Sequence, residues 1–123
     1  MITTLDDIAW LTNCRGTDID YNPVFFSYAL FYVKEGEERL DLFTDPQKVA
    51  DIQEYLSTHK INVLPYESIT EVLEKLASDN DKKVGVHTNT CNAALWNILK
   101  DKSGVELKDN IVQFAKAEKN ETE

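Results

Sequence analysis

Apolar residues recur every three or four positions in four stretches of the chain, the spacing that places them on one face of a helix. The starts of three stretches carry capping signals: Thr4 with Asp7, Asp45 before Pro46, and the Ser68-x-x-Glu71 box. The sequence therefore predicts helices whose buried faces comprise Leu5, Ile8 and Leu11; Val49, Ile52 and Leu56; Ile69, Val72, Leu73 and Leu76; and Ala94, Leu95, Ile98 and Leu99, the last within Thr90–Lys100.

Other stretches have the composition of strands. Val24–Val33 is aromatic and β-branched with almost no charge, which predicts a central strand covered on both faces. A polar turn separates it from Arg39–Thr44, where charged and apolar residues alternate, so the two segments predict a hairpin. Three shorter strands are expected at Ile61–Leu64, Lys83–His87 and Gly104–Leu107.

Strands that alternate with helices indicate parallel pairing with helices on both faces of a sheet. We therefore expect an α/β fold: a mixed sheet of about five strands, led by a hairpin, with helices on both faces. With 123 residues, 42% of them hydrophobic, the chain can bury one core. We expect a single domain over residues 1–113. Residues 114–123 are charged, permit a helix and lack apolar partners, so they predict a helical junction.

The net charge of -9 repels polyphosphate, which argues against nucleic acid as a partner. No apolar run approaches the roughly 20 residues that cross a bilayer, and the first residues lack the features of a signal peptide. We therefore expect no membrane partner and a cytoplasmic location. Cys14 and Cys91 are far apart and outside any CxxC spacing, which favours buried thiols over a disulfide.

The sequence offers few groups for catalysis. His59 and His87 are the only histidines, without the spacing of a zinc or dinuclear hydrolase, so we expect no metal site and no catalytic residue. His59 is expected at a helix C-terminus, where it complements the helix dipole. His87 is expected at the end of a strand, a weaker candidate for binding. The glycines form no phosphate-binding loop.

The segment Cys14–Pro23 stands apart because it carries polar and aromatic side chains next to an uncharged strand. Four of its residues are candidates for contact with a substrate or another domain: Arg15, Asp20, Tyr21 and Asn22. The alternative is purely structural. In that case Arg15 pairs with Asp18 or Asp20, and Asn22-Pro23 only turns the chain.

This segment and the residues that flank it also carry a family resemblance. Leu5–Leu11, Asn13–Ile19 and Tyr21–Tyr28 closely resemble the signature LDEIAWLxNxRGxDxxYNPVFFxY of the middle domain of three-domain Xaa-Pro aminopeptidases (aminopeptidase P). Lys116–Glu123 is similar to the KAxKNxxE junction at which the catalytic domain of that family begins. Between about Glu35 and Leu107 the resemblance is one of pattern more than of residues.

The resemblance implies a creatinase/prolidase N-terminal-like fold and a non-catalytic fragment of a cytosolic peptidase that removes an N-terminal residue before proline. The resemblance also implies that the parent enzyme is a homodimer in which a separate catalytic domain binds two manganese ions through two Asp, one His and two Glu. The expected partners are that catalytic domain, the first domain of the same chain, and a peptide with proline at its second position. In this family an upstream strand would precede Ile2–Thr4, leaving those residues as a stub.

From the resemblance we expect Arg15–Pro23 to face the catalytic domain or the active-site entrance. Arg15 would supply charge to a contact between domains or to a peptide carboxylate, and Tyr21 with Asn22 would shape the opening. The competing hypothesis is a stand-alone module that binds a small ligand or a protein through the same loop and His87.

Overall fold

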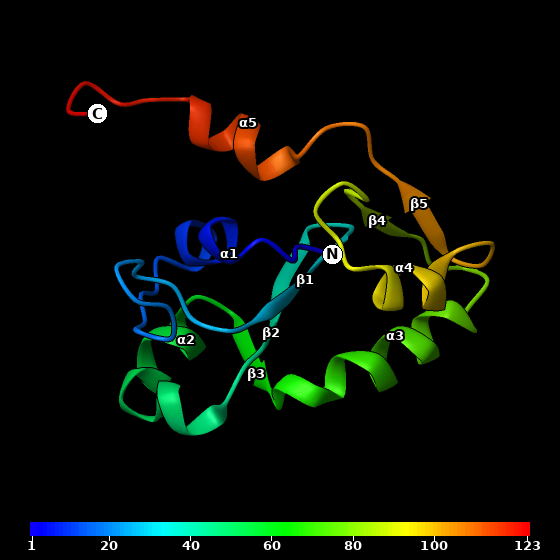
Figure 1. Ribbon diagram of the computed structural model, residues 1–123, viewed down its shortest axis with the longest axis horizontal. Helices are drawn as coiled ribbons and strands as arrows, with labels where there is room; N and C mark the ends of the chain where they lie inside the picture. The colour runs from blue at the N-terminus through cyan, green and yellow to red at the C-terminus, as the bar shows by residue number, and fades with distance from the viewer.

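The computed structural model describes residues 1–123 and contains helices and strands in alternation (Figure 1). In chain order the elements are α1 (Leu5–Thr12), β1 (Tyr28–Lys34), β2 (Glu37–Phe43), the 3-10 helix η1 (Pro46–Ile52), α2 (Gln53–Thr58), β3 (Ile61–Leu64), the 3-10 turn η2 (Tyr66–Ser68), α3 (Ile69–Ala77), β4 (Val84–Val86), α4 (Ala93–Leu99), β5 (Gly104–Glu106) and α5 (Ile111–Ala117). The α/β class is confirmed. None of these helices is long and apolar enough to cross a membrane.

The leading hairpin is confirmed. β1 and β2 pair antiparallel from Tyr28 opposite Phe43 to Lys34 opposite Glu37, and β3 adds to β2 in parallel. Glu35 and Gly36 form the two-residue turn with φ of 36° and 84°. Positive φ at both positions matches the twist of the flanking strands, which is why short hairpins favour such turns.

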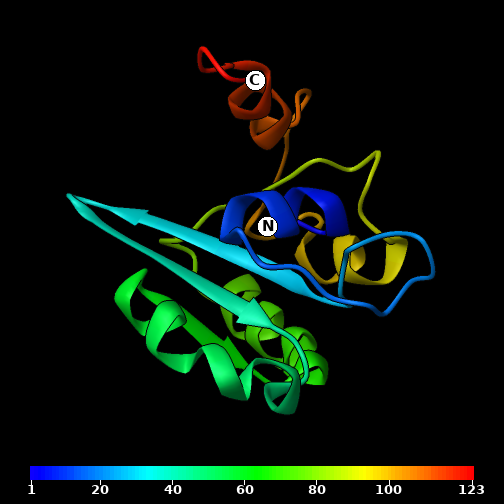
Figure 2. The same ribbon diagram turned by 90° about the vertical axis from the view of Figure 1, so that its left-hand side faces the viewer.

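The prediction of a central strand at Val24–Val33 is wrong. β1 begins only at Tyr28 and lies at the side of its sheet, while β2 is the middle strand. The far end of β1 projects beyond the helices, as Figure 2 shows for the hairpin, and residue Val33 is 70% exposed. Aromatic and β-branched residues suit any pleated strand, so composition alone does not separate a central strand from an edge strand.

The five predicted strands form two sheets, β1-β2-β3 and the parallel pair β4-β5, joined by the first residues of the chain. Ile2 exchanges both backbone hydrogen bonds with Ala29 of β1, and the Met1 amine donates to the Gly85 carbonyl of β4 at 2.7 Å. The N-terminal residues thus occupy the seam between the two sheets (Figure 1).

Helices on both faces of the sheet are confirmed, because the two faces of the hairpin contribute to two apolar clusters. Leu30 and Phe43 point into the first, which α3 and α4 complete with Leu73 and Leu99. The second cluster lies on the opposite face and contains Ala29, Leu40, Leu42, Ile8, Cys14, Phe25, Val49 and Leu56. Alternation along the strands therefore sends successive side chains to separate cores.

The predicted helix starts had mixed outcomes. The Asp45 carboxylate accepts a hydrogen bond from the Gln47 N–H, as predicted, although the first helix there is a 3-10 helix. The capping box at Ser68 is wrong: the Ser68 hydroxyl donates to the Pro65 carbonyl within η2, and Glu71 pairs with Lys75. A local turn competed for the serine hydroxyl, as short polar side chains often do.

Two other helix starts differ from the sequence-based boundaries. α4 begins at Ala93 and not at Thr90, and it is capped by Asn92, whose side-chain oxygen accepts the Leu95 N–H. α5 begins at Ile111, three residues before the expected junction, with Asn110 as its cap. The C-terminal residues extend beyond α5, away from the body of the domain (Figure 1).

Candidate functional site

The loop that carries the four candidate residues is closed by its own backbone. The Gly16 N–H donates to the Pro23 carbonyl at 3.4 Å, and the Asp18 N–H donates to the Val24 carbonyl at 3.2 Å. The two sides approach so closely that a Cβ on Gly16 would lie 2.7 Å from the Phe25 Cβ. Glycine is therefore required at this position for steric room.

Arg15 serves the preceding helix. Its guanidinium Nη1 donates to the Ala9 carbonyl at 2.6 Å and to the Cys14 carbonyl at 2.9 Å. Ala9 is among the last residues of α1, whose carbonyls have no partner inside the helix, so a cation is favourable there. The structural alternative expected Arg15 to pair with Asp18 or Asp20, and that pairing is wrong.

Asp18 anchors the loop from the other side. Its carboxylate accepts a 2.7 Å hydrogen bond from the Phe26 N–H and forms an ion pair with Lys48 at the start of η1. The hydrogen bond from Lys48, together with that from the Phe26 backbone, lowers the pKa of the Asp18 carboxyl below its usual range. The loop is thus tied to the segment just before β1 and to η1.

The tip of the loop presents Asp20, Tyr21 and Asn22 to solvent, and their side chains make no hydrogen bond within the chain. Ile19 and Asn22 pair through a backbone bridge, so Asp20 and Tyr21 are the central residues of a tight turn. Tyr21 has a φ of 61°, a left-handed conformation that is uncommon for residues other than Gly, Asn and Asp, and its side chain is fully exposed. The backbone therefore adopts an unfavourable conformation at Tyr21, although its aromatic side chain packs against nothing in the chain.

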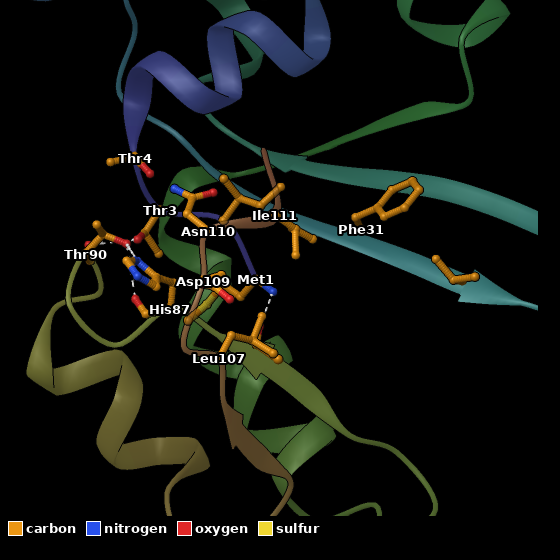
Figure 3. A pocket seen from close by; sticks show the side chains of 13 residues that line it. Met1, Thr3, Thr4, Phe31, His87, Thr90, Leu107, Asp109, Asn110 and Ile111 are labelled. Atoms are coloured by element: carbon orange, nitrogen blue, oxygen red, sulfur yellow. Dashed lines mark hydrogen bonds between the residues drawn. The ribbon is translucent and has the colours of Figure 1, made fainter. Parts of the chain in front are cut away.

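A separate cavity of about 200 Å³ lies at the seam between the sheets (Figure 3). His87 lies in its wall after β4, with the Thr90 hydroxyl 3.1 Å from its Nδ1. The Thr3 hydroxyl donates to the Thr90 carbonyl, and Asp109 lines the cavity from the segment before α5. The cavity shares no residue with the Arg15–Pro23 loop, so the structure does not bring His87 together with the four candidates.

The Met1 amine also lines this cavity. Burial lowers the pKa of the Met1 α-amino group to about 6, with Cys91 opposing the shift. The wall therefore combines one histidine, one carboxylate and an amine. No group of three or more His, Cys, Asp or Glu side chains is arranged anywhere in the chain to hold a metal ion.

The remaining candidates, His59 and the two cysteines, make contacts that belong to the packing of the fold. His59 follows α2 as its C-cap, as predicted, and its ring contacts Tyr55 with the centroids 4.5 Å apart. Cys14 is buried in the second cluster, as predicted, while Cys91 is half-buried near the Met1 amine; both are free thiols. Burial raises the pKa of the Cys91 thiol, which does not favour a nucleophilic thiolate.

Comparison with known proteins places this geometry in a family. The sequence model of the creatinase/prolidase N-terminal domain matches residues 1–123. The chain belongs to this family. A probable Xaa-Pro aminopeptidase P of Pyricularia oryzae is 38% identical over 135 residues, which cover 100% of this chain and 21% of that protein. An Xaa-Pro aminopeptidase 1 of Dictyostelium discoideum is 36% identical and matches 100% of this chain, or 18% of its own length.

A solved structure agrees with this creatinase/prolidase N-terminal domain. The X-prolyl aminopeptidase of Caenorhabditis elegans, described as a cytosolic enzyme with a di-nuclear active site, superposes with a TM-score of 0.78 and 27% identity. The match covers 95% of this chain and 19% of that one. The chain thus spans about a fifth of the length of the relatives that match it throughout.

One cluster in this creatinase/prolidase N-terminal domain was not anticipated from sequence. Asp7 is fully buried and accepts hydrogen bonds from residues more than 100 positions away. In the sequence it had the features of an ordinary capping residue, with Thr4 three positions before it. Its depth and its distant partners follow from the packing of α5 against α1, and no local pattern predicts that packing.

Proposed function

We propose that this chain is the non-catalytic domain of a longer Xaa-Pro aminopeptidase, a peptidase that removes an N-terminal residue preceding proline. The observation that carries the proposal is that the whole chain matches about a fifth of the length of proteins that bear this name. The alternative of a stand-alone binding module is not favoured, because the matching relatives are several times longer than this chain.

In the proposed parent, hydrolysis takes place in a separate catalytic domain. We assign two manganese ions to that domain, in keeping with the di-nuclear active site of the Caenorhabditis elegans enzyme. The residues of this chain do not fit a metal pair. His59 packs against Tyr55 while His87 lines the cavity at the seam, and carboxylates do not converge on either histidine. The chain would contribute shape and contacts to the active-site entrance, in a cytoplasmic homodimer.

The Arg15–Pro23 loop is the surface we assign to that role, facing the catalytic domain or the active-site entrance. Support comes from Tyr21, a fully exposed aromatic side chain held in an unfavourable backbone conformation. Asp20 and Asn22 flank it with free polar side chains. Arg15 takes part by holding the base of the loop through its two carbonyl contacts. Residues 114–123 would form the junction toward the catalytic domain.

Peptidase assays on two proteins test the assignment of catalysis. The purified 123-residue chain and the longer protein that contains it are each incubated with Mn²⁺ and a peptide with proline second. We expect release of the N-terminal residue by the longer protein alone. Turnover by the isolated chain would contradict the non-catalytic role, and inactivity of the longer protein toward Xaa-Pro bonds would contradict the proposed enzyme class.

Substitutions in the longer protein test the loop. We expect Arg15→Ala and Tyr21→Ala to change kcat or KM for longer Xaa-Pro peptides. Thr17→Ala provides a matched control, because Thr17 is an exposed residue of the same loop whose side chain makes no hydrogen bond. Unchanged constants in both Arg15→Ala and Tyr21→Ala would remove the substrate-facing role from the loop.

A further inference from the structure

Asp7 joins two parts of the chain that are distant in sequence. It lies in the first turn of α1, fully buried, and its carboxylate accepts hydrogen bonds from Asn110 Nδ2 at 2.7 Å and Gln113 Nε2 at 2.5 Å. Lys116 Nζ lies 3.2 Å from the same carboxylate, and the Thr4 hydroxyl donates to it at 2.8 Å. Both oxygens of the carboxylate therefore accept hydrogen bonds from protein donors, which a buried charge requires.

The three distant donors define the orientation of α5. Asn110, Gln113 and Lys116 are spaced by three residues, so they lie along one face of the helix. Asn110 also caps α5, because its side-chain oxygen accepts the N–H groups of Val112 and Gln113. One side chain thus starts the helix and ties it to Asp7. The buried Asp7 carboxylate thus contacts both the start of α5 and Lys116 in its last turn, where the exposed Asp6 also pairs with Lys116.

Apolar packing contributes little to the attachment of α5. Val112 is its only buried residue, whereas Ile111 and Phe114 are 59% and 63% exposed. Figures 1 and 2 show α5 at the periphery of the domain, with the C-terminal residues continuing away from it. A helix of seven residues is not stable in isolation, so its order depends on this attachment.

We propose that Asp7 is a positioning residue that clasps α5 to α1 and sets the direction in which the chain leaves the domain. Hydrogen bonds to a buried charge are short and directional, so they fix an orientation more closely than an exposed apolar contact does. The consequence for catalysis rests on the proposed function, in which the catalytic domain follows α5. The clasp itself is a property of this chain.

Backbone order measured by NMR relaxation tests the clasp in the 123-residue chain. In wild type we expect amide order parameters near those of rigid backbone, about 0.85, for Phe114 and Ala115, and in Asp7→Asn values below about 0.6. Asp6→Asn is the matched control, because Asp6 is the neighbouring exposed carboxylate and contacts only Lys116. Order in α5 that survives Asp7→Asn would overturn the clasp.

A second variant removes two of the three donors on the α5 side, leaves the cap residue Asn110 in place, and covers the case in which Asp7→Asn does not fold. Gln113→Ala combined with Lys116→Ala leaves Asp7 and the apolar clusters in place. We expect the same loss of α5 order, with β1 and β2 unaffected. A rigid α5 in this variant would also overturn the clasp.

Kinetics in the longer protein test the positioning role. Asp7→Asn is expected to lower kcat/KM for an Xaa-Pro peptide by about tenfold, since small displacements of catalytic geometry have large effects on rate. Asp6→Asn should stay within about twofold. If α5 loses order while kcat/KM is unchanged, Asp7 does not position the catalytic domain. If wild type has no Xaa-Pro activity, the proposed function fails, and the relaxation data still decide on the clasp.

Discussion

Asp18 and Asp7 each attach a peripheral segment to the domain, but the two segments depend on them to different degrees. The Arg15–Pro23 loop is also held by two backbone hydrogen bonds and by the close contact of Gly16 with Phe25. α5 has Val112 as its buried side chain, and its other ties are the hydrogen bonds to the buried Asp7 and one exposed ion pair between Lys116 and Asp6. A segment fixed by main-chain bonds and packing tolerates the loss of one side chain, whereas a segment fixed by one carboxylate does not.

The largest effect is expected where the loop depends on packing. Gly16→Ala places a Cβ 2.7 Å from the Phe25 Cβ and 3.1 Å from the Val24 carbonyl oxygen, so the two sides of the loop must separate. We expect the free energy of unfolding to fall by about 3 kcal/mol, the upper range for overpacking. The urea midpoint of the 123-residue chain measures the change.

Gly36→Ala is the control for that substitution. Gly36 has a φ of 84° but open space around its Cα, so alanine there introduces backbone strain without a steric clash. The expected loss is about 1 kcal/mol. Equal losses in the two variants would mean that close packing does not hold the loop more firmly than an ordinary turn.

The next largest effect on the free energy of unfolding is expected from substitutions of the two carboxylates, Asp7 and Asp18. Asp7→Asn should lower the free energy of unfolding by about 2 kcal/mol, because it weakens several hydrogen bonds to a buried charge. Asp18→Asn should cost about 0.5 kcal/mol, since its ion pair with Lys48 is partly exposed and the loop keeps its backbone bonds. Urea unfolding of both variants tests the ranking, and a larger loss for Asp18→Asn would reverse the comparison.

Acid should release α5 before it opens the loop. Burial alone would raise the pKa of the Asp7 carboxyl, but hydrogen bonds from Asn110, Thr4 and Lys116 lower it below the usual range of an aspartic acid. A carboxyl whose pKa is lower in the folded state than in the unfolded state stabilises the fold at pH values above its unfolded-state pKa. That stabilisation is lost as the pH falls through the folded-state pKa. The window therefore lies below about pH 4.

The other charges around Asp7 do not change this window. Lys116 stays protonated in acid: burial would lower its pKa, but the hydrogen bonds that it donates to Asp7 and to the exposed Asp6 raise its pKa above the usual value. Amide order in α5, followed by NMR from pH 6 to pH 2, should fall before order in the loop does. Simultaneous loss in the two segments would indicate that Asp7 is no more critical than Asp18.

Local patterns predicted most of the fold. The helical spacing of Leu73 and Leu76 and the hairpin at Glu35-Gly36 depend on neighbours within a few residues, so the sequence contains the information directly. The edge position of β1 was missed because its composition suits either an edge or a central strand. Ser68 was misread because a competing turn lies just before it.

The sequence singled out the polar segment that carries the candidate residues, but not the contacts that these residues make. The segment Cys14–Pro23 forms a loop whose tip, Ile19–Pro23, is exposed. The partners of Arg15 and Asp18 were not predictable, because they depend on how α1 ends and on where η1 brings Lys48. Asp7 is the extreme case, since its partners lie 103 to 109 residues away.

The smallest effect concerns the tip of the loop and has the opposite sign. Tyr21→Gly relieves a left-handed conformation that costs a residue with a side chain about 1 kcal/mol, while glycine loses more entropy on folding. We expect the chain to become more stable by about 0.5 kcal/mol in urea. Ile19→Gly provides the contrast, because Ile19 has no positive φ and should lose stability.

A gain in stability on Tyr21→Gly together with weaker Xaa-Pro hydrolysis in the longer protein would mean that the strain at Tyr21 is retained for contact and not for folding. A loss of stability would mean that the Tyr21 ring supports the loop despite its exposure. The loop would then resemble α5 in depending on a single side chain, and the contrast between the two segments would not hold.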